Sequence, residues 1–396
     1  MTELTFSITP TDAIETAALQ RVLKEFESRT RINVQLHEID TKSAREAITQ
    51  FAVTGKGPDV SQIGSSWLRG IVDMNVLCPF TARDIAQIGT PADFIEASWT
   101  STFIPGQPSV QWAIPWLADV RMVCYRTDLL KNAGIEEQGA FATPEAFDRT
   151  LRQLQSSGVP IPWVVPTKHS WRTLHNIASW VWGAGGEFVD SDGKQPMFDR
   201  LEALTGIKAY FALGRYLMGH ARGLTTSQSD VLFMSGQAAA TISGPHLLAM
   251  SPELLDRVGF TSPPGPPFVG GSHLVIWKYT RHEDEAVKLV QALTNIAAQK
   301  SYGLGSLLPV SVDALSEIGT LDGQKGAFAR YVQRAQVAGR SFWPVHLWNI
   351  VEANLVEAMA SIWDEILRSP VPDLDRILQR TLSTLAYRLT MSLNSE

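Results

Sequence analysis

The sequence is rich in tryptophan, and several of these residues stand where a ligand could reach them. The chain has 12 Trp. Five fall at expected loop or helix-start positions: Trp67, Trp116, Trp171, Trp343 and Trp348. The face of an indole is apolar and partly negative, so it suits the apolar, weakly positive C–H patches of a pyranose ring. This distribution predicts stacking on a carbohydrate, with structural packing as the alternative for any single Trp.

Polar side chains that could meet sugar hydroxyls stand at similar positions in the sequence. Hydroxyl groups favour charged or planar polar partners. The candidates are Ser65, Ser66, Asp119, Arg172, His175, His246 and Ser272. Together with the tryptophans, they predict a site that binds a polyhydroxylated ligand.

No pattern in the sequence predicts catalysis. The GxSxG, HExxH and P-loop motifs are missing, and no GxGxxG follows the first expected strand. A glycoside hydrolase needs two carboxylates facing its substrate, whereas only Asp119 is well placed. We therefore expect a binding protein with no catalytic residue and no cofactor. A glycoside-processing enzyme is the less favoured alternative.

The cysteine and acid spacings predict no metal site. Asp190 and Asp192 lie in a Gly-rich stretch that could suggest calcium, but the third oxygen ligand and the Glu at position twelve are missing. We expect a plain turn there. Cys78 and Cys124 have no CxxC or Cys/His ligand spacing, so buried free thiols are expected and a disulfide is the minor alternative.

The overall composition is that of a globular protein with two domains. The 396 residues exceed what one hydrophobic core usually serves. Charged residues make up 19% and hydrophobic residues 44%, with a net charge of -6. Lys and Arg form no basic stripe, so we expect no nucleic-acid partner. No apolar run approaches the ~20 residues of a membrane span, so no membrane insertion is expected.

The first residues form a β-α-β pattern that would position the candidates. Strands are expected at Leu4–Ile8, Asn33–Ile39 and Val60–Ile63, with a helix after the first of them. Ligands of parallel sheets gather beyond the carboxyl ends of the strands. Ser65, Ser66 and Trp67 stand on the loop after the expected strand Val60–Ile63 and before a helix.

The sequence from Thr143 onward also predicts alternating helices and strands that would position candidate residues. Thr143 is expected to cap a helix whose first-turn position is Pro144. A Pro-bounded strand follows at 159–166, and the next segment would place Trp171 and His175 on the first turns of a helix that runs to Trp182. Another amphipathic helix is expected at Leu374–Leu393.

Two apolar runs separated by a Pro-Trp break at 112–130 predict a passage from one lobe into another. SPPGPP at 262–267 suits a rigid return. A third passage is expected near Leu307–Val312.

These segments, in this order from about Leu4 to Trp363, resemble the bacterial extracytoplasmic solute-binding proteins of ABC importers, family 1, the maltose-binding-like group. The resemblance rests on the Pro-x-x-x-acid segment Pro115–Asp119, on FMSGQAAATISG at 233–244, on Gly244-Pro245 and on Pro309-Val310. In these relatives an aromatic residue usually follows the Gly-Pro pair, so His246 departs from the pattern and suggests a ligand other than maltodextrin.

The resemblance implies an α/β periplasmic-binding-protein fold of type II. Its two lobes would each contain a mostly parallel sheet flanked by helices, joined by a three-segment hinge. The N-terminal lobe would span 1–115 and 270–312, and the C-terminal lobe 116–269 and 313–396. Trp67, Ser65 and Ser66 would belong to the first lobe, Trp171, His175, His246 and Trp348 to the second, and Asp119 would lie beside the hinge.

The resemblance also implies the function. The protein would act as a monomer that closes on a carbohydrate, expected to be a di- or oligosaccharide, and delivers it to the permease subunits of an ABC importer. It would then work in the periplasm or on the extracytoplasmic surface. The segment MTELTFSITP lacks the regions of a signal peptide, so either an export signal has been removed or the protein is a cytosolic carbohydrate sensor on the same scaffold.

Overall fold

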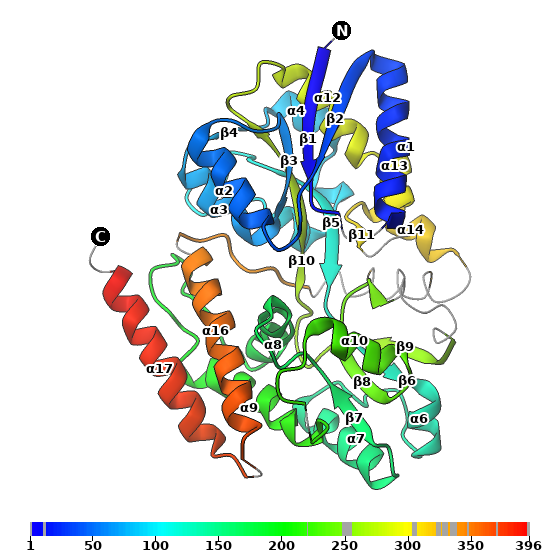
Figure 1. Cartoon of the computed structure of the whole chain (residues 1–396), viewed down its shortest axis with the longest axis vertical. Helices are drawn as coiled ribbons and strands as arrows, with labels where there is room; N and C mark the ends of the chain where they lie inside the picture. The colour runs from blue at the N-terminus through cyan, green and yellow to red at the C-terminus, as the bar shows by residue number, and fades with distance from the viewer. Residues whose placement is uncertain are drawn as a thin grey trace. The chain divides into compact units, whose positions relative to one another are not determined.

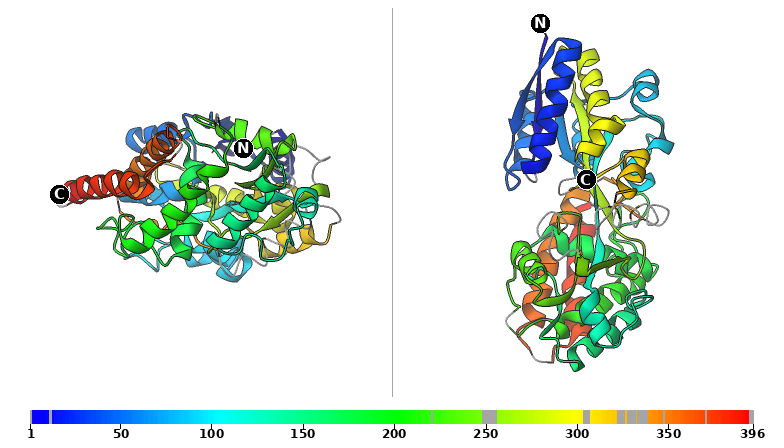
Figure 2. Two further views of the ribbon diagram at one scale, coloured as in Figure 1. Left: turned by 90° about the horizontal axis from the view of Figure 1, so that it is seen from below. Right: turned by 90° about the vertical axis from the view of Figure 1, so that its right-hand side faces the viewer.

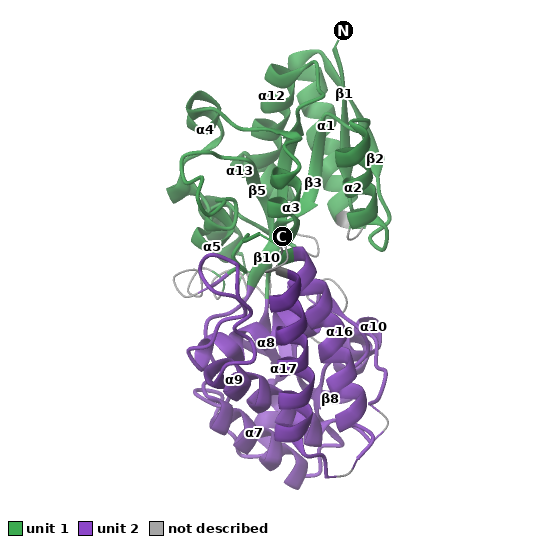
Figure 3. Cartoon of the chain, turned by 90° about the vertical axis from the view of Figure 1, so that its left-hand side faces the viewer, with its two compact units in different colours: residues 1–120, 269–337, 341–348 green, residues 121–268, 338–340, 349–396 purple. Residues whose placement is uncertain are grey.

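The computed structural model describes residues 2–10, 13–219, 221–247, 256–302, 307–321, 326, 332, 339–346, 348–369 and 371–393. It divides into two compact units, which Figure 3 shows in different colours. Unit 1 contains residues 1–120, 269–337 and 341–348; unit 2 contains residues 121–268, 338–340 and 349–396. Each unit combines a sheet with flanking helices, as the sequence predicted.

Unit 1 is built from many short elements. Its strands are β1 (Thr2–Ile8), β2 (Ile32–Glu38), β3 (Val60–Gly64), β4 (Leu77–Cys78), β5 (Ile114–Val120), β10 (Val269–Trp277) and β11 (Leu308–Pro309). Its helices are α1 (Ala13–Thr30), α2 (Ala44–Thr54), η1 (Ser65–Trp67), α3 (Leu68–Asp73), α4 (Ala82–Ile88), η2 (Pro91–Asp93), α5 (Glu96–Thr100), α12 (Glu283–Thr294), α13 (Ile296–Tyr302) and α14 (Val312–Gly319). The predicted strands at Leu4–Ile8, Asn33–Ile39 and Val60–Ile63 are confirmed to within two residues.

In the described residues, the sheet of unit 1 has seven strands in the order β11-β5-β10-β3-β1-β2, with β4 paired to β10. β1 pairs in parallel with β2 and β3, whereas β10 runs antiparallel to β3, β4 and β5. The sheet is therefore mixed, which corrects the prediction of a mostly parallel sheet. The reason is that β10 returns from unit 2 and enters the sheet in the opposite direction.

Helices cover both faces of this sheet. α1 packs on α12 and α13 on one face (Figure 1). Trp116 lies between Phe6 and Tyr302, with ring centroids 5.8 and 5.5 Å away. On the other face, side chains of α2 and α3 pack around Trp277, whose Nε1–H donates to Ser61 Oγ over 2.8 Å. Both faces bury apolar surface, which is the main stabilisation of the unit.

Unit 2 holds the smaller sheet. Its strands are β6 (Met122–Arg126), β7 (Ile161–Val164), β8 (Ala238–Ser243) and β9 (Val258–Thr261). Its helices are α6 (Thr127–Asn132), α7 (Pro144–Ser156), α8 (Trp171–Gly183), α9 (Leu201–Ala212), η3 (Leu213–Tyr216), α10 (Thr226–Met234), α16 (Trp348–Ile366, of which Trp348 falls in unit 1) and α17 (Leu374–Leu393). The four strands lie in the order β7-β8-β6-β9, with β7 parallel to β8 and β6 antiparallel to β8 and β9. This sheet is also mixed.

The helices of unit 2 confirm several local predictions. The Thr143 hydroxyl accepts a hydrogen bond from the Ala146 N–H at the start of α7, as a cap should. α8 begins at Trp171 and runs to Gly183, and α17 has the bounds expected for the last helix. α17 runs alongside α16 on the outside of the unit, as Figure 2 also shows, and packs on α9.

Pro115 does not interrupt a strand, contrary to expectation. β5 continues through Pro115 and Trp116 to Val120, and Pro115 pairs with His273 next to a bulge in β5, where Trp116 has no partner residue in β10. A proline is tolerated at such a bulge because the ladder hydrogen bond is already interrupted there. The first passage between units therefore falls at 120/121 instead of 115/116.

The third passage also lies elsewhere than predicted. Leu308 and Pro309 form β11, which pairs with β5 inside unit 1, and α14 then packs on α13. The predicted lobe boundary after 312 is therefore corrected, because α14 belongs to unit 1. Among the described residues, later passages fall at 340/341 and 348/349.

The chain segments that pass between the units are hydrogen-bonded to one another within each unit. In unit 1, β5 and β10 pair at Val120 and Val269, and the Ser341 hydroxyl donates to the Val269 carbonyl over 2.5 Å. In unit 2, the Arg121 N–H donates to the Phe268 carbonyl over 2.9 Å, and Phe268 forms a parallel bridge with Arg340. Each unit thus holds three passing segments side by side.

Candidate functional site

The carboxyl ends of β7 and β8 gather the polar residues of unit 2 at one edge of its sheet. β7 and β8 are parallel, so the chain after Val164 and the chain after Ser243 leave at the same edge. α8 begins after the first of these ends, and a turn that carries His246 follows the second. Ser243 pairs with Met122, which places the entry of the chain into unit 2 at this edge as well.

Four side chains form a polar cluster at this edge. Arg172 Nη1 donates to Asp230 Oδ2 over 2.8 Å and lies 2.8 Å from His246 Nε2. His246 Nε2 lies 2.9 Å from Asp230 Oδ2 and 3.2 Å from Ser243 Oγ. The structure therefore joins two predicted residues, Arg172 and His246, through Asp230, a carboxylate that the sequence analysis did not single out.

Local sequence explains how α8 and α10 hold this cluster. The Ser170 hydroxyl caps α8 by accepting from the Arg172 N–H, and its oxygen lies 3.0 Å from Thr226 Oγ1 at the start of α10. Thr226 and Asp230 are four residues apart and so share one face of α10. The starts of both helices are thereby fixed beside each other, with Asp230 one turn further along.

The charges of the cluster determine its protonation. Burial raises the pKa of Asp230, but the hydrogen bonds and charges of His246 and Arg172 outweigh burial and hold the pKa below its ordinary value. Burial lowers the pKa of His246, and the nearby positive charges of Arg172 and Arg121 lower it further, against the opposing effect of Asp230. At neutral pH the cluster consists of a carboxylate, a guanidinium and a neutral imidazole.

The cluster lacks the geometry of a nucleophilic triad. Ser243 Oγ and Asp230 Oδ2 both approach the same ring nitrogen of His246, Nε2. A Ser-His-Asp triad needs the nucleophile and the acid on opposite nitrogens, so that the acid orients the ring while the ring takes the proton. Ser243 is also buried.

Two predicted aromatic residues lie on the first turns of α8, next to this cluster. Trp171 is 37% exposed. The ring of His175 stacks on Phe268, with centroids 4.3 Å apart and an interplanar angle of 17°. Phe268 in turn stacks on Trp182, and the Arg340 guanidinium lies 4.8 Å from the Trp182 ring. Unit 2 therefore offers an accessible indole, that of Trp171, and the imidazole of His175, which is held by stacking on Phe268.

In unit 1, other predicted residues lie at the edge from which the chain leaves. Ser65, Ser66 and Trp67 form η1, directly after the carboxyl end of β3, and all three are partly exposed. Asp119 is partly exposed near the end of β5, where it pairs with Gly270 of β10. Ser272 pairs with Gly64 near the same edge, but its side chain is buried.

Of the five tryptophans predicted to bind ligand, the remaining three comprise one exposed and two buried residues. Trp343 is 49% exposed in the segment before α16. Trp116 is fully buried in the core of unit 1, which corrects its assignment as a ligand platform. Trp348 is 2% exposed, and its ring centroid lies 4.6 Å from that of Phe342. Trp348 also falls in unit 1 instead of the second lobe, so neither buried indole is retained in the candidate site.

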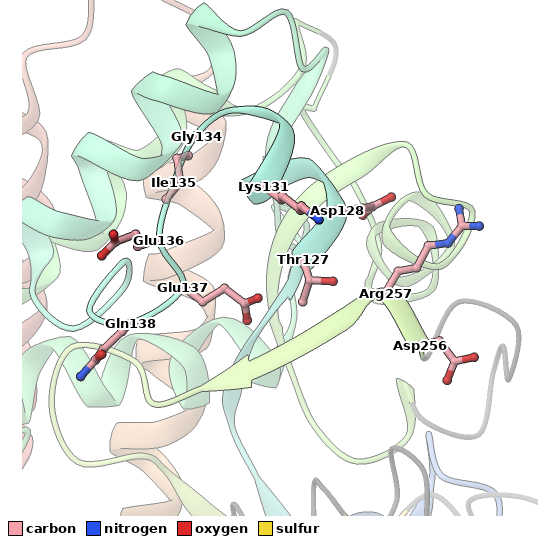
Figure 4. A pocket seen from close by; sticks show the side chains of 10 residues that line it. All are labelled: Thr127, Asp128, Lys131, Gly134, Ile135, Glu136, Glu137, Gln138, Asp256 and Arg257. Atoms are coloured by element: carbon pink, nitrogen blue, oxygen red, sulfur yellow. The ribbon is translucent and has the colours of Figure 1, made fainter.

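A separate pocket of about 800 Å³ lies at the opposite edge of the sheet of unit 2, where β6 ends (Figure 4). Its lining mixes both signs of charge, including Lys131, Arg257, Glu136 and Glu137. None of the residues predicted to bind ligand lines it. Asp128 lies in this pocket and is paired with Arg126, at 2.8 Å from Nε to Oδ1.

The described part of the chain offers no metal site. No group of three or more His, Cys, Asp or Glu among those residues could hold an ion. Asp190 Oδ1 instead accepts backbone N–H bonds from Lys194 and Gln195, which confirms the predicted turn.

Cys78 and Cys124 are free thiols. No helix in the described residues is both long and apolar enough to cross a bilayer.

Comparison with known proteins gives a family match and a curated relative. The model of the family described as "Bacterial extracellular solute-binding protein" matches residues 11–300. The diacetylchitobiose binding protein DasA of Streptomyces coelicolor is 24% identical over 284 residues, which cover 68% of this chain and 64% of DasA. The match thus spans less than two thirds of the length of that relative.

Solved structures agree with the fold. The GacH receptor of Streptomyces glaucescens GLA.O, studied unliganded and in complex with acarbose, matches with a TM-score of 0.80 at 16% identity over 99% of each chain. The sugar-binding protein MalE from Xanthomonas citri matches with a TM-score of 0.80 at 20% identity, over 99% of this chain and 98% of its own. These matches confirm the predicted two-lobe, type II periplasmic-binding-protein fold.

Proposed function

Because the chain belongs to the family of bacterial extracellular solute-binding proteins, we propose that it binds a carbohydrate and delivers it to the permease of an ABC importer. The observation that carries this proposal is the placement of exposed or partly exposed aromatic and polar side chains at the edge of each sheet where the chain leaves for the other unit. In unit 2 these are Trp171, Arg172 and His246; in unit 1 they are Trp67 and Asp119.

The chemistry of these residues fits sugars better than ions. Indole faces stack on the apolar patches of a pyranose, while the guanidinium and imidazole exchange hydrogen bonds with hydroxyls. Arg172 and Asp230 cancel each other's charge and His246 is neutral, so these three side chains together carry no net charge that would favour a charged ligand. The names of the relatives also refer to sugars: DasA to diacetylchitobiose and MalE to sugar binding.

In the proposed mechanism the protein moves between an open and a closed form. A ligand that contacts both edges stabilises the closed form by its differential binding free energy. The closed, liganded monomer then docks on the permease on the extracytoplasmic side of the membrane. Locating the protein by fractionation of its native cells tests this location; a purely cytosolic protein would favour a carbohydrate sensor instead.

A thermal-shift screen of mono- and oligosaccharides tests the proposal. A ligand at ~100 times its dissociation constant adds roughly 2.7 kcal/mol to the folded state, so a true ligand raises Tm clearly. Trp171→Ala should remove the shift. Tyr387→Ala truncates another exposed aromatic residue, on the outer helix α17, and should leave the shift unchanged. If no saccharide raises Tm, or if both variants behave alike, the proposed site is wrong.

We also propose that the protein does not turn its ligand over. Asp230, the acid nearest the candidate residues in unit 2, has a side chain only 7% exposed and is engaged by Arg172 and His246. A glycoside-processing enzyme needs two carboxylates that can reach the glycosidic bond. Long incubation with a bound oligosaccharide should therefore return it unchanged; release of shorter sugars would support the enzyme alternative.

A further inference from the structure

Phe268 lies where segments that pass between the units are bonded to one another. Its carbonyl accepts from the Arg121 N–H over 2.9 Å, and its backbone forms a parallel bridge with Arg340, whose N–H donates to the Pro267 carbonyl over 3.0 Å. Phe268 is itself the last residue of unit 2 before the chain returns to unit 1 at Val269. Its main chain therefore joins three passing segments on the side of unit 2.

The side chain of Phe268 packs on α8, the helix that begins with Trp171 and Arg172. Its ring is 3% exposed and lies nearly parallel to two rings of α8. The centroid distances are 4.3 Å to His175, at 17°, and 6.4 Å to Trp182, at 19°. His175 and Trp182 are seven residues apart, so they project from the same face of the helix. Phe268 thus packs across two turns of α8.

The chain just before Phe268 is also packed tightly on α8. The φ angle of Gly265 is 123°, and a Cβ there would lie 2.1 Å from the Ser179 carbonyl oxygen. A Cβ on Gly183 would lie 2.5 Å from the Pro264 carbonyl oxygen. The backbone of this segment therefore touches the backbone of α8 directly, and α8 and the segment form one closely packed body within unit 2.

We infer that Phe268 is a positioning residue, whose ring fixes the direction of the His175 imidazole and ties that imidazole to the segments that pass between the units. His175 is partly exposed and Phe268 is buried, so the imidazole and not the phenyl ring is available to a ligand. A side chain held against a fixed ring loses less conformational freedom when it binds a ligand. This role in ligand binding rests on the proposed function.

The arrangement makes the ligand contact and the passing segments depend on each other. A change in the backbone at Phe268 displaces its ring against His175, because closely packed interiors transmit such shifts. Conversely, a ligand that holds the imidazole restrains Phe268 and the hydrogen bonds of its main chain. The N–H groups of Arg121 and Arg340 report on this restraint, since they donate to the carbonyls of Phe268 and Pro267.

Hydrogen exchange of the full chain measures the tie without any ligand. His175→Ala takes away a packing partner of the Phe268 ring. The Arg121 and Arg340 amides should then exchange about three- to tenfold faster relative to the amides of β8, which corresponds to the loss of one aromatic contact. Phe268→Leu removes the ring itself and should accelerate the same two amides at least as much.

The ligand arm uses the saccharide found in the screen. Phe268→Leu should weaken its binding by about three- to tenfold, again the value of one aromatic contact. If Phe268 acts through His175, the two substitutions are not additive, and Phe268→Leu in the His175→Ala background should change the dissociation constant by less than about twofold. A merely structural role of Phe268 would produce the same loss in both backgrounds.

Phe211→Leu is the matched control. Phe211 is another buried phenylalanine of unit 2, 1% exposed, and its ring centroid lies 4.6 Å from that of Trp363. It contacts an aromatic ring as Phe268 does, but it lies on α9 and is not a candidate ligand residue. This variant should bind the saccharide with wild-type affinity, and its Arg121 and Arg340 amides should exchange at wild-type rates relative to β8.

Unchanged exchange of the Arg121 and Arg340 amides in His175→Ala overturns the inference, as does an equal acceleration in Phe211→Leu. Unchanged affinity in Phe268→Leu, or losses that add with those of His175→Ala, overturns the role in binding. If Phe268→Leu does not fold, the exchange rates of His175→Ala still decide. If no saccharide binds while the exchange results hold, the proposed function fails and the tie between His175 and the passing segments stands.

Discussion

His273 should make unit 1 sensitive to acid. This residue is buried on β10, and its Nε2 lies 3.1 Å from Ser101 Oγ. The Ser101 hydroxyl donates to the Ser98 carbonyl, so its oxygen is left to accept from the Nε2–H of a neutral imidazole. Burial lowers the pKa of His273 to about 4, with hydrogen bonds to Ser272 and Ser101 opposing this shift. The folded protein thus resists the proton that the unfolded chain accepts.

The sign and size of the effect follow from proton linkage. The unfolded chain takes up this proton near the ordinary histidine pKa of about 6.5, so between about pH 6.5 and 4 it binds more protons than the folded state. The free energy of unfolding therefore falls as the pH drops through this window. Between about pH 8 and pH 5 the loss from His273 alone is roughly 2 kcal/mol, obtained from the two pKa values.

Urea unfolding of the wild type and of His273→Gln at both pH values isolates this contribution. Glutamine can still donate to Ser101 but does not titrate, so the stability difference between the two proteins should shift by about 2 kcal/mol in favour of the variant at the lower pH. Exchange of amide hydrogens on β10 provides the local probe, because the two units can unfold separately. His37→Gln, at an exposed position on β2, controls for substitution itself. An equal pH dependence in wild type and His273→Gln would refute the reasoning.

Other predictions concern packing and local structure. Trp116→Ala should destabilise unit 1 by about 3 to 5 kcal/mol, as expected for a fully buried aromatic, whereas Trp343→Ala at an exposed position should change stability by less than about 0.5 kcal/mol; similar values in urea unfolding would contradict their assigned burial. Gly271→Ala should lower Tm, because φ is 130° there and a Cβ would lie 2.0 Å from the Leu117 carbonyl oxygen; an unchanged Tm would show that β10 can shift. Thr143→Ala should cost about 1 kcal/mol through loss of the α7 cap, with Thr143→Ser as the control that restores it.

Local sequence signals were sufficient wherever the structure depends on neighbours along the chain. The Thr143 cap, the start of α8 at Trp171 and the extent of α17 were all predictable, because capping and apolar periodicity act over a few residues. The position of η1 after β3 followed from the same reasoning. These signals placed several candidate residues at the carboxyl ends of strands.

Burial could not be predicted for the tryptophans. Trp116 follows a proline, which suggested a break, yet β5 pairs with the distant strand β10 on both sides of a bulge at Trp116 and stays intact. Trp348 stands at a helix start, which suggested exposure, yet Phe342 packs against it. In both cases the partner that removes the indole from solvent comes from outside the local pattern.

The contribution of Asp230 to the candidate site could not be predicted from the sequence either. It is a single acid in an otherwise unremarkable helix, and its role emerges only because α10 lies beside the start of α8 and the turn after β8. The passing segment at Arg340 and Ser341 carried no recognisable signal either, since its partners Phe268 and Val269 are far away in the sequence.

The amino-acid sequence determined the elements, their order and the class of fold, because hydrogen bonding and apolar spacing within each element are properties of nearby residues. The tertiary structure decided which indoles are buried, where the chain passes between the units and which acid supports Arg172 and His246. Those properties depend on contacts that no pattern of neighbouring residues encodes, and some of them join residues far apart in the chain, such as Arg172 with Asp230 (58 positions).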